Sequence, residues 1–161
     1  MKRTLSLLVI LSLTLFSCKQ QTALKYNNYV IELELALVPG TTAATSKIDS
    51  WIEADKWDSV AAISKRMQSE VQGSIDKIQK KDAPDLKGAA EFKQGALRYF
   101  AYIRDIYTGY IKLAEQPDAE ARSTESAKFL SMINEKDKVI SDFQEKQRAF
   151  ASANKIKLES K

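Results

Sequence analysis

The stretch that decides the fold class is residues 57–78, with the sequence WDSVAAISKRMQSEVQGSIDKI. Its apolar and small side chains recur every three or four residues, which is the spacing of one face of an α-helix. The members of this stripe are Trp57, Val60, Ser64, Met67, Val71, Ser74 and Ile78, with Ile63 and Ile75 beside them. No part of the chain shows sustained alternation with a period of two, so we expect helices and no sheet.

The same spacing extends over most of the chain and predicts four helices, over residues 22–53, 56–81, 89–115 and 118–153. Only five glycines and three prolines occur among the 161 residues, which suits a few long helices better than many turns. Because the connections are short, sequential helices should be antiparallel neighbours. The sequence therefore predicts an all-α domain over residues 23–154, an antiparallel up-down-up-down four-helix bundle.

Two of the predicted helices contain interruptions. Pro39-Gly40 would ordinarily end a helix, yet the apolar spacing resumes in register after it, which favours one long helix kinked at Pro39. Separate helices over 22–37 and 42–53 are the alternative. In the last helix Lys136 and Gln147 fall on the inner stripe. They mark either a polar spot in the bundle or a snorkelling lysine and a glutamine that fixes register.

The N-terminus has the organisation of a bacterial secretion signal. Lys2 and Arg3 precede an apolar stretch, Leu5 to Phe16, of 12 residues. This length suits the core of a signal peptide, since a membrane-spanning helix needs about 20 apolar residues. We therefore expect residues 1–17 to be a signal peptide, whose removal leaves 144 residues, the size of one domain.

The signal ends at Leu15-Phe16-Ser17-Cys18, which resembles the lipobox of bacterial lipoproteins. A large aliphatic residue lies three before the cysteine and a small one directly before it, although Phe16 is bulkier than usual. Cys18, the only cysteine, is then the expected site of lipid attachment, and two or three acyl chains would anchor the protein stably to a membrane. Residues 18–22 are expected to form a short tether, and residues 155–161 a frayed tail.

The residues after Cys18 bear on location. No aspartate follows the cysteine directly, and no acidic run of the kind seen in some surface-exported lipoproteins is present. We therefore expect anchoring to the outer membrane with the domain facing the periplasm. Display at the cell surface is the alternative.

Several chemistries lack the residues that they need. The chain has no histidine, the commonest general base near neutral pH and a common metal ligand. Glu32 and Glu34 are two apart on a helix and diverge by about 200°, so they cannot share a substrate. No nucleophile motif or phosphate-binding glycine loop occurs. We expect no enzyme activity, cofactor or metal.

The charge of the chain bears on whether it binds nucleic acids. The formal net charge is +4, and it falls to +2 once Lys2 and Arg3 leave with the signal. Acidic and basic residues are interspersed along the helices, which is typical of a solvated surface. We expect no nucleic-acid partner.

Aromatic residues are concentrated in the third predicted helix. Tyr99, Tyr107 and Tyr110 could line a ligand groove between helices, with their hydroxyls orienting the ligand. The alternative is a core in which tyrosines bury their rings and reach water or a partner with the hydroxyl. The core reading is favoured because these positions follow the inner stripe.

The order of features resembles a family of small helical lipoproteins common in Bacteroidetes, described as surface proteins by analogy with a Leptospira member. The resemblance rests on residues 26–31, 88–93, 96–100, 143–144 and 147–151, with the sequences YNNYVI, GAAEFK, ALRYF, FQ and QRAFA. It covers nearly all of the mature chain through loose motifs. The resemblance implies a four-helix bundle in the cell envelope and brings no catalytic residue. Pro39-Gly40 departs from the uninterrupted first helix that it implies.

These observations predict a non-enzymatic binding or structural module, held in the cell envelope by lipid and engaging an envelope protein. The alternative is a carrier or sensor that holds an apolar small molecule between its helices.

Overall fold

The computed structural model describes residues 3–158, with side chains from Cys18 onward, and this part of the chain contains helices and no strand. The helices are α1 (Arg3–Glu53), α2 (Trp57–Lys80), α3 (Ala89–Ala114), α4 (Ala119–Ile133) and α5 (Lys136–Ala153). The predicted all-helical class and helical bundle are therefore confirmed. Residues 159–161 and the side chains of residues 1–17 lie outside the described part.

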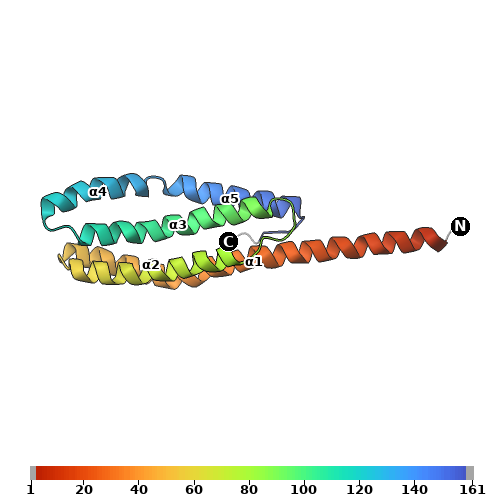
Figure 1. Ribbon diagram of the computed structural model, residues 1–161, viewed down its shortest axis with the longest axis horizontal. Helices are drawn as coiled ribbons and strands as arrows, with labels where there is room; N and C mark the ends of the chain where they lie inside the picture. The colour runs from red at the N-terminus through yellow and green to blue at the C-terminus, as the bar shows by residue number, and fades with distance from the viewer. Residues whose placement is uncertain (1–2, 159–161) are drawn as a thin grey trace.

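The helices run along one long axis, with α4 and α5 placed end to end beside α3 (Figure 1). The turn between α1 and α2 and the connection between α3 and α4 lie at one end, which we call the far end. The opposite end, where α1 enters the bundle, is the entry end; it is formed by residues 18–26, 80–88 and 152–158. The N-terminal part of α1 extends beyond it.

The core follows the stripe that the sequence of α2 predicts. Val60, Met67 and Val71 are completely buried, and α2 packs most extensively against α3. Phe92, Phe100 and Phe150 are the largest completely buried side chains. At roughly 25 cal/mol per Å² of apolar area, burial of these large rings is a substantial contribution to the stability of the bundle.

Helix α1 continues through Pro39, so the alternative of two separate helices is wrong. Proline lacks the N–H that would bond to the carbonyl of Leu35, but Pro39 and Leu35 are both exposed, and water can satisfy that carbonyl. Gly40 faces α2, where a Cβ would come within 3.2 Å of the Met67 Cε. The Pro-Gly pair therefore lies inside the helix at a close approach to α2.

The prediction of one helix over 118–153 is wrong, because Asn134 and Glu135 form a turn between α4 and α5. The side chain of Asp118 caps α4 by accepting from the Ala121 N–H at 2.8 Å. In the described structure α4 has no buried residue, and it packs mainly against α3. Lys136, directly after this turn, is exposed and does not lie on the inner stripe as predicted. The turn thus keeps the lysine charge out of the core, where its burial would be costly.

Both ends of the predicted domain also differ from expectation. The first helix begins at Arg3 rather than near Thr22, so residues 18–22 are helical and do not form an irregular tether. Residues 155–158 are not frayed: Ile156 is only 8% exposed and belongs to the core. The Gln20 Nε2 donates to the Lys155 carbonyl at 2.7 Å and joins this segment to α1.

Candidate functional site

Cys18 lies on α1 at the entry end and is an exposed free cysteine. The Thr22 hydroxyl donates to its carbonyl at 2.9 Å, within regular helix. Ala23, five residues further, is completely buried in the core. At about 1.5 Å of rise per residue, Cys18 is only roughly 8 Å along the helix from the first layer of the bundle.

The entry end is held together by contacts between distant parts of the chain. The Asn154 Nδ2 donates to the Lys87 carbonyl at 2.9 Å, which joins the end of α5 to the loop before α3. Gly88 has a φ of 80° and lies against the backbone of Phe150, where a Cβ would be 3.4 Å from the Phe150 Cα. Glycine adopts this φ without strain and allows the loop to pass close to α5. The loop and the C-terminal segment therefore have fixed positions beside α1.

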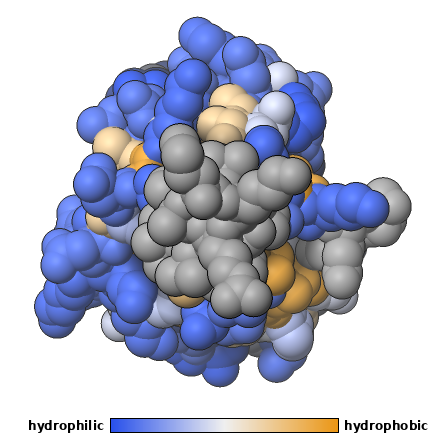
Figure 2. All heavy atoms as spheres, turned by 90° about the vertical axis from the view of Figure 1, so that its right-hand side faces the viewer, coloured by the Kyte–Doolittle hydropathy of each residue, from blue (hydrophilic) through white to orange (hydrophobic). Residues whose placement is uncertain are grey.

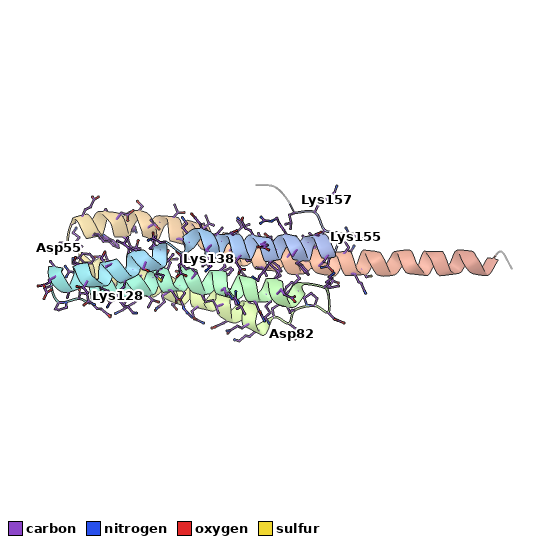
Figure 3. All side chains as sticks on the ribbon, turned by 90° about the horizontal axis from the view of Figure 1, so that it is seen from above. Asp55, Asp82, Lys128, Lys138, Lys155 and Lys157 are labelled. Atoms are coloured by element: carbon purple, nitrogen blue, oxygen red, sulfur yellow. The ribbon has the colours of Figure 1, made fainter. Side chains whose placement is uncertain are left out.

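Charge is strongly uneven at this end. The entry end carries seven lysines and two aspartates, all of them exposed, which gives an excess of five positive charges. In the rest of the chain from Cys18 onward, acidic residues outnumber basic ones by three. Asp82, Lys155 and Lys157 lie toward this end in Figure 3, whereas Asp55 and Lys128 lie at the far end. The lysines of the entry end are Lys19, Lys25, Lys80, Lys81, Lys87, Lys155 and Lys157.

A hollow of about 470 Å³ opens between α1 and the loop after α2. The Tyr29 hydroxyl donates to the Lys77 carbonyl at 3.0 Å, and the Lys81 Nζ lies 5.5 Å from the centre of the Tyr29 ring. This volume is in the range of small-molecule sites. The lining combines bases, acids and aromatic rings: Thr22, Lys25, Tyr26, Tyr29, Glu32, Lys81, Asp82 and Pro84.

Tyr26 also reaches into the core beneath that hollow. Its ring packs edge-on against Phe92 and Phe150, each with centroids 6.1 Å away. Its hydroxyl is buried and has no hydrogen-bond partner among the described residues. Burial raises the pKa of Tyr26 to about 12, with a smaller contribution from the charge of Tyr29.

The three tyrosines predicted to line a groove have separate surroundings. The Tyr99 ring stacks on Phe143 at 4.8 Å, and its hydroxyl donates to the Glu34 carboxylate at 3.0 Å. Tyr107 is 4% exposed. Tyr110 packs against Phe129, with centroids 4.7 Å apart. Tyr99 and Tyr110 thus pack against rings of α5 and α4, and a ligand groove there stays a prediction.

Burial raises the pKa values of all three tyrosines. The pKa of Tyr107 rises to about 12, with smaller contributions from Tyr110 and Glu70. Burial also raises the pKa of Tyr99, and the Glu34 carboxylate adds to this effect. For Tyr110 the second cause is Asp49. These phenols are therefore neutral acids at physiological pH, and none is activated as a base.

A hydrogen bond between two polar side chains joins α1 to α5. Of these two side chains, the sequence analysis identified only Gln147. The Gln147 Nε2 donates to the Asn27 Oδ1 at 2.9 Å, and Asn27 is only 6% exposed. The interpretation of Gln147 as a residue that fixes register agrees with this contact. Asn27 lies one position beside the apolar stripe of α1, so spacing gave no reason to select it.

No family model, curated protein or solved structure matches the chain. The resemblance to small helical lipoproteins therefore stays a prediction. Across the described residues, no helix has both the length and the apolar character needed to span a membrane. The same part of the chain contains no cluster of acidic and cysteine side chains suited to hold a metal ion.

Proposed function

We propose that this chain is a lipoprotein precursor whose residues 1–17 direct secretion and whose Cys18 receives the lipid. The observation that carries the proposal is the position of Cys18. It is the only cysteine, directly follows the apolar stretch, and is exposed about 8 Å before the folded core. An enzyme that modifies the thiol and a peptidase that cleaves before it both need such access.

The anchored domain is an antiparallel up-down-up-down four-helix bundle, in which α4 and α5 together take the place of the fourth helix, on the periplasmic side of the outer membrane, with the cell surface as the alternative. Short connections at alternating ends of the bundle support the topology (Figure 1). The absence of an aspartate after Cys18 supports the location.

The domain acts as a non-enzymatic binding or structural module for an envelope protein. Support comes from α1, where Leu35 and Val38 are 45% and 49% exposed. Leu24, which is 41% exposed, lies 11 and 14 residues before them and so shares one face of α1 with them, while Ile31 on the same face is partly buried against the core. An exposed apolar stripe of this kind is typical of a surface that binds another protein.

The anchoring is tested by metabolic labelling with palmitate in cells that produce the full chain. We expect the wild type to incorporate label and Cys18→Ser to incorporate none. The matched control combines Cys18→Ser with Ser46→Cys, which keeps one exposed thiol but moves it away from the apolar stretch. Label on Cys18→Ser would refute the proposal, and label on the control would show that any exposed thiol suffices.

The binding role is tested by crosslinking in intact cells, followed by purification of the lipidated protein. Leu35→Ser/Val38→Ser should lose a crosslinked envelope protein that Thr42→Ser, on the same face, retains. A partner that both variants retain equally would exclude the α1 stripe.

A second candidate function is that of a small-molecule carrier, favoured by the hollow beside Tyr26 and Tyr29. Native mass spectrometry of the lipidated protein in mild detergent should then show an added mass. Tyr29→Ala should remove that mass, whereas Tyr102→Ala, far from the hollow, should not. Identical spectra without added mass would exclude the carrier.

A further inference from the structure

We propose that the entry end of the bundle docks directly on the anionic headgroups of the membrane to which Cys18 is anchored, holding the long axis of the domain upright. This inference rests on the proposed lipidation of Cys18 and adds a protein surface that recognises the bilayer.

The first observation is the concentration of charge. Seven of the lysines from Cys18 onward lie in the three short segments of the entry end, against only two aspartates, while the remainder has an excess of acids. Such a molecule is electrically polarised along its axis. An anionic surface would attract the entry end and repel the rest, which favours one orientation.

The second observation is that these lysines are displayed on a fixed frame. Hydrogen bonds from Gln20 to Lys155 and from Asn154 to Lys87 join the three segments. Among the described ion pairs, none uses the side chains of Lys25 or Lys81. Figure 2, which views the molecule from this side, shows a mainly hydrophilic surface around the grey atoms. The backbone positions of these lysines are therefore set before they meet headgroups, and only their side chains have to adjust.

The third observation is the short distance between anchor and frame. Cys18 is part of α1, and Ala23 is completely buried five residues later, so roughly 8 Å of rigid helix separates them. The headgroup layer of one leaflet is itself about 5–8 Å thick, and the Debye length at physiological salt is about 8 Å. A lipid on Cys18 therefore places Lys19 directly beside the headgroups and Lys81, which contacts Tyr29, within roughly 16 Å of Cys18, about two Debye lengths, whereas a long flexible tether would set no such distance.

The distribution of acids favours membrane lipid over a soluble anion as the partner. The hollow beside this end is lined by Asp82, Lys25 and Lys81 and also by Glu32, which lies just beyond the entry end on α1, so the hollow has no excess of positive charge. The positive excess arises only over the whole end, which suits a charged plane.

The test measures the reactivity of individual lysines in the full lipidated protein. The protein is reconstituted into vesicles of phosphatidylethanolamine with phosphatidylglycerol, or of phosphatidylcholine alone. Amine labelling is then followed by mass spectrometry. A surface potential of about −30 mV raises the pKa of a nearby lysine by about half a unit and slows its labelling by about three-fold.

We expect this slowing at Lys81, Lys87 and Lys157 in the anionic vesicles only, and its loss in about 1 M NaCl, where the Debye length is about 3 Å. Lys47 is the internal reference, because it lies 24 residues beyond Ala23 on α1, roughly 36 Å away. Slowing of Lys47 together with the entry-end lysines would indicate a bundle lying flat and would overturn the proposal. Equal rates in anionic and neutral vesicles would also overturn it.

A matched pair of variants tests the lysines themselves. Lys80→Glu/Lys81→Glu/Lys87→Glu reverses the sign of the entry end, and Lys157 should then label at nearly its rate in neutral vesicles. Lys47→Glu/Lys56→Glu/Lys112→Glu makes the same change in total charge at the far end and should leave Lys157 protected. Loss of protection in both variants would overturn the assignment to the entry end.

The acyl mass on Cys18 is read from the same samples. An acylated chain with uniform lysine reactivity would refute the docking alone. A chain without acyl groups would refute the anchoring and the docking that rests on it.

Discussion

Replacing Gly109 by alanine tests how α4 is held on α3. A Cβ at Gly109 would lie 2.3 Å from the Phe129 Cδ2 and 2.5 Å from its Cε2. These are atoms of a rigid ring, which also contacts Tyr110, so relief requires the ring or the whole of α4 to move. Gly109 is therefore a notch in α3 into which Phe129 of α4 fits.

The magnitude follows from two opposing effects. Alanine in a helix interior is favoured over glycine by about 0.5–1 kcal/mol, while overpacking costs about 1–3 kcal/mol. Gly73 in α2 provides the reference, because a Cβ there would meet nothing within 4 Å. Gly73→Ala should thus raise the free energy of unfolding, and Gly109→Ala should fall about 1–3 kcal/mol below it.

Urea denaturation of the wild type, Gly73→Ala and Gly109→Ala measures the differences in the free energy of unfolding. Hydrogen exchange shows which helix is destabilised. Since α4 has no buried residue, its displacement is the easiest relief, and its amides should exchange faster in Gly109→Ala. Phe129→Ala removes the ring, so adding Gly109→Ala to that background should be favourable, as at Gly73. If Gly109→Ala stabilises the wild type as much as Gly73→Ala does, Phe129 does not occupy the notch and the α3–α4 packing is wrong.

Three further predictions concern buried polar groups. Tyr26→Phe removes a buried hydroxyl that has no partner among residues 18–158 and should raise the free energy of unfolding by about 1–3 kcal/mol; a lower value in urea denaturation would mean that the hydroxyl is bonded. The pKa values of Tyr26 and Tyr107 are raised from 10.0 to about 12, so the native state retains protons that the unfolded state releases. Stability should be complete below pH 10 and fall as the pH rises toward 12, by at most roughly 2 kcal/mol per tyrosine after screening, and a urea midpoint constant over this range would contradict it. Gln147→Ala leaves the Asn27 amide oxygen without its donor and should cost about 1–3 kcal/mol, whereas an unchanged midpoint would show that water replaces the bond.

The parts of the fold that the sequence predicts well are those in which one helix face does all the packing. In α2, residues such as Val60 and Met67 lie on the predicted stripe and are completely buried. The continuity of α1 through Pro39 is predictable for the same reason, since the stripe keeps its register across the proline. Apolar spacing predicts a helix well where packing of one face against neighbouring helices contributes more to its stability than the helix propensity of its residues.

The division between α4 and α5 could not be read from spacing. Phe129, Ile133 and Ile140 continue a helical pattern, but residues 119–128 offer no large apolar side chain. The fit of Phe129 to Gly109 joins residues on different helices, and no pattern within one helix reports it. Ile156 was missed for a related reason, because an isolated apolar residue after a helix has no period.

The candidate site also has one part with a local sequence pattern, Cys18, and one part without such a pattern, the basic entry end. The prediction for Cys18 stays a prediction and rests on a contiguous pattern: a basic start, an apolar stretch and a small residue before the cysteine. The basic entry end has no such pattern, because residues 18–26, 80–88 and 152–158 are each only mildly basic. The net charge of the chain gives no sign of the basic entry end, because acidic residues elsewhere nearly cancel its positive excess.

Under the proposed lipidation of Cys18 and the proposed partner site on α1, the helical connection between Cys18 and the core has a consequence for partner binding. With a flexible tether the α1 stripe would sample many heights and directions above the membrane. With helix α1 continuous from Cys18, Leu35 and Val38 lie 17 and 20 residues beyond the anchor, roughly 25–30 Å from it when the bundle stands upright. A partner held in the same membrane then meets the stripe at a fixed height, and less orientational freedom is lost on binding. The two proposals are thus compatible: docking of the entry end on the membrane would hold the bundle upright, and an upright bundle would present Leu35 and Val38 at a constant height above the membrane.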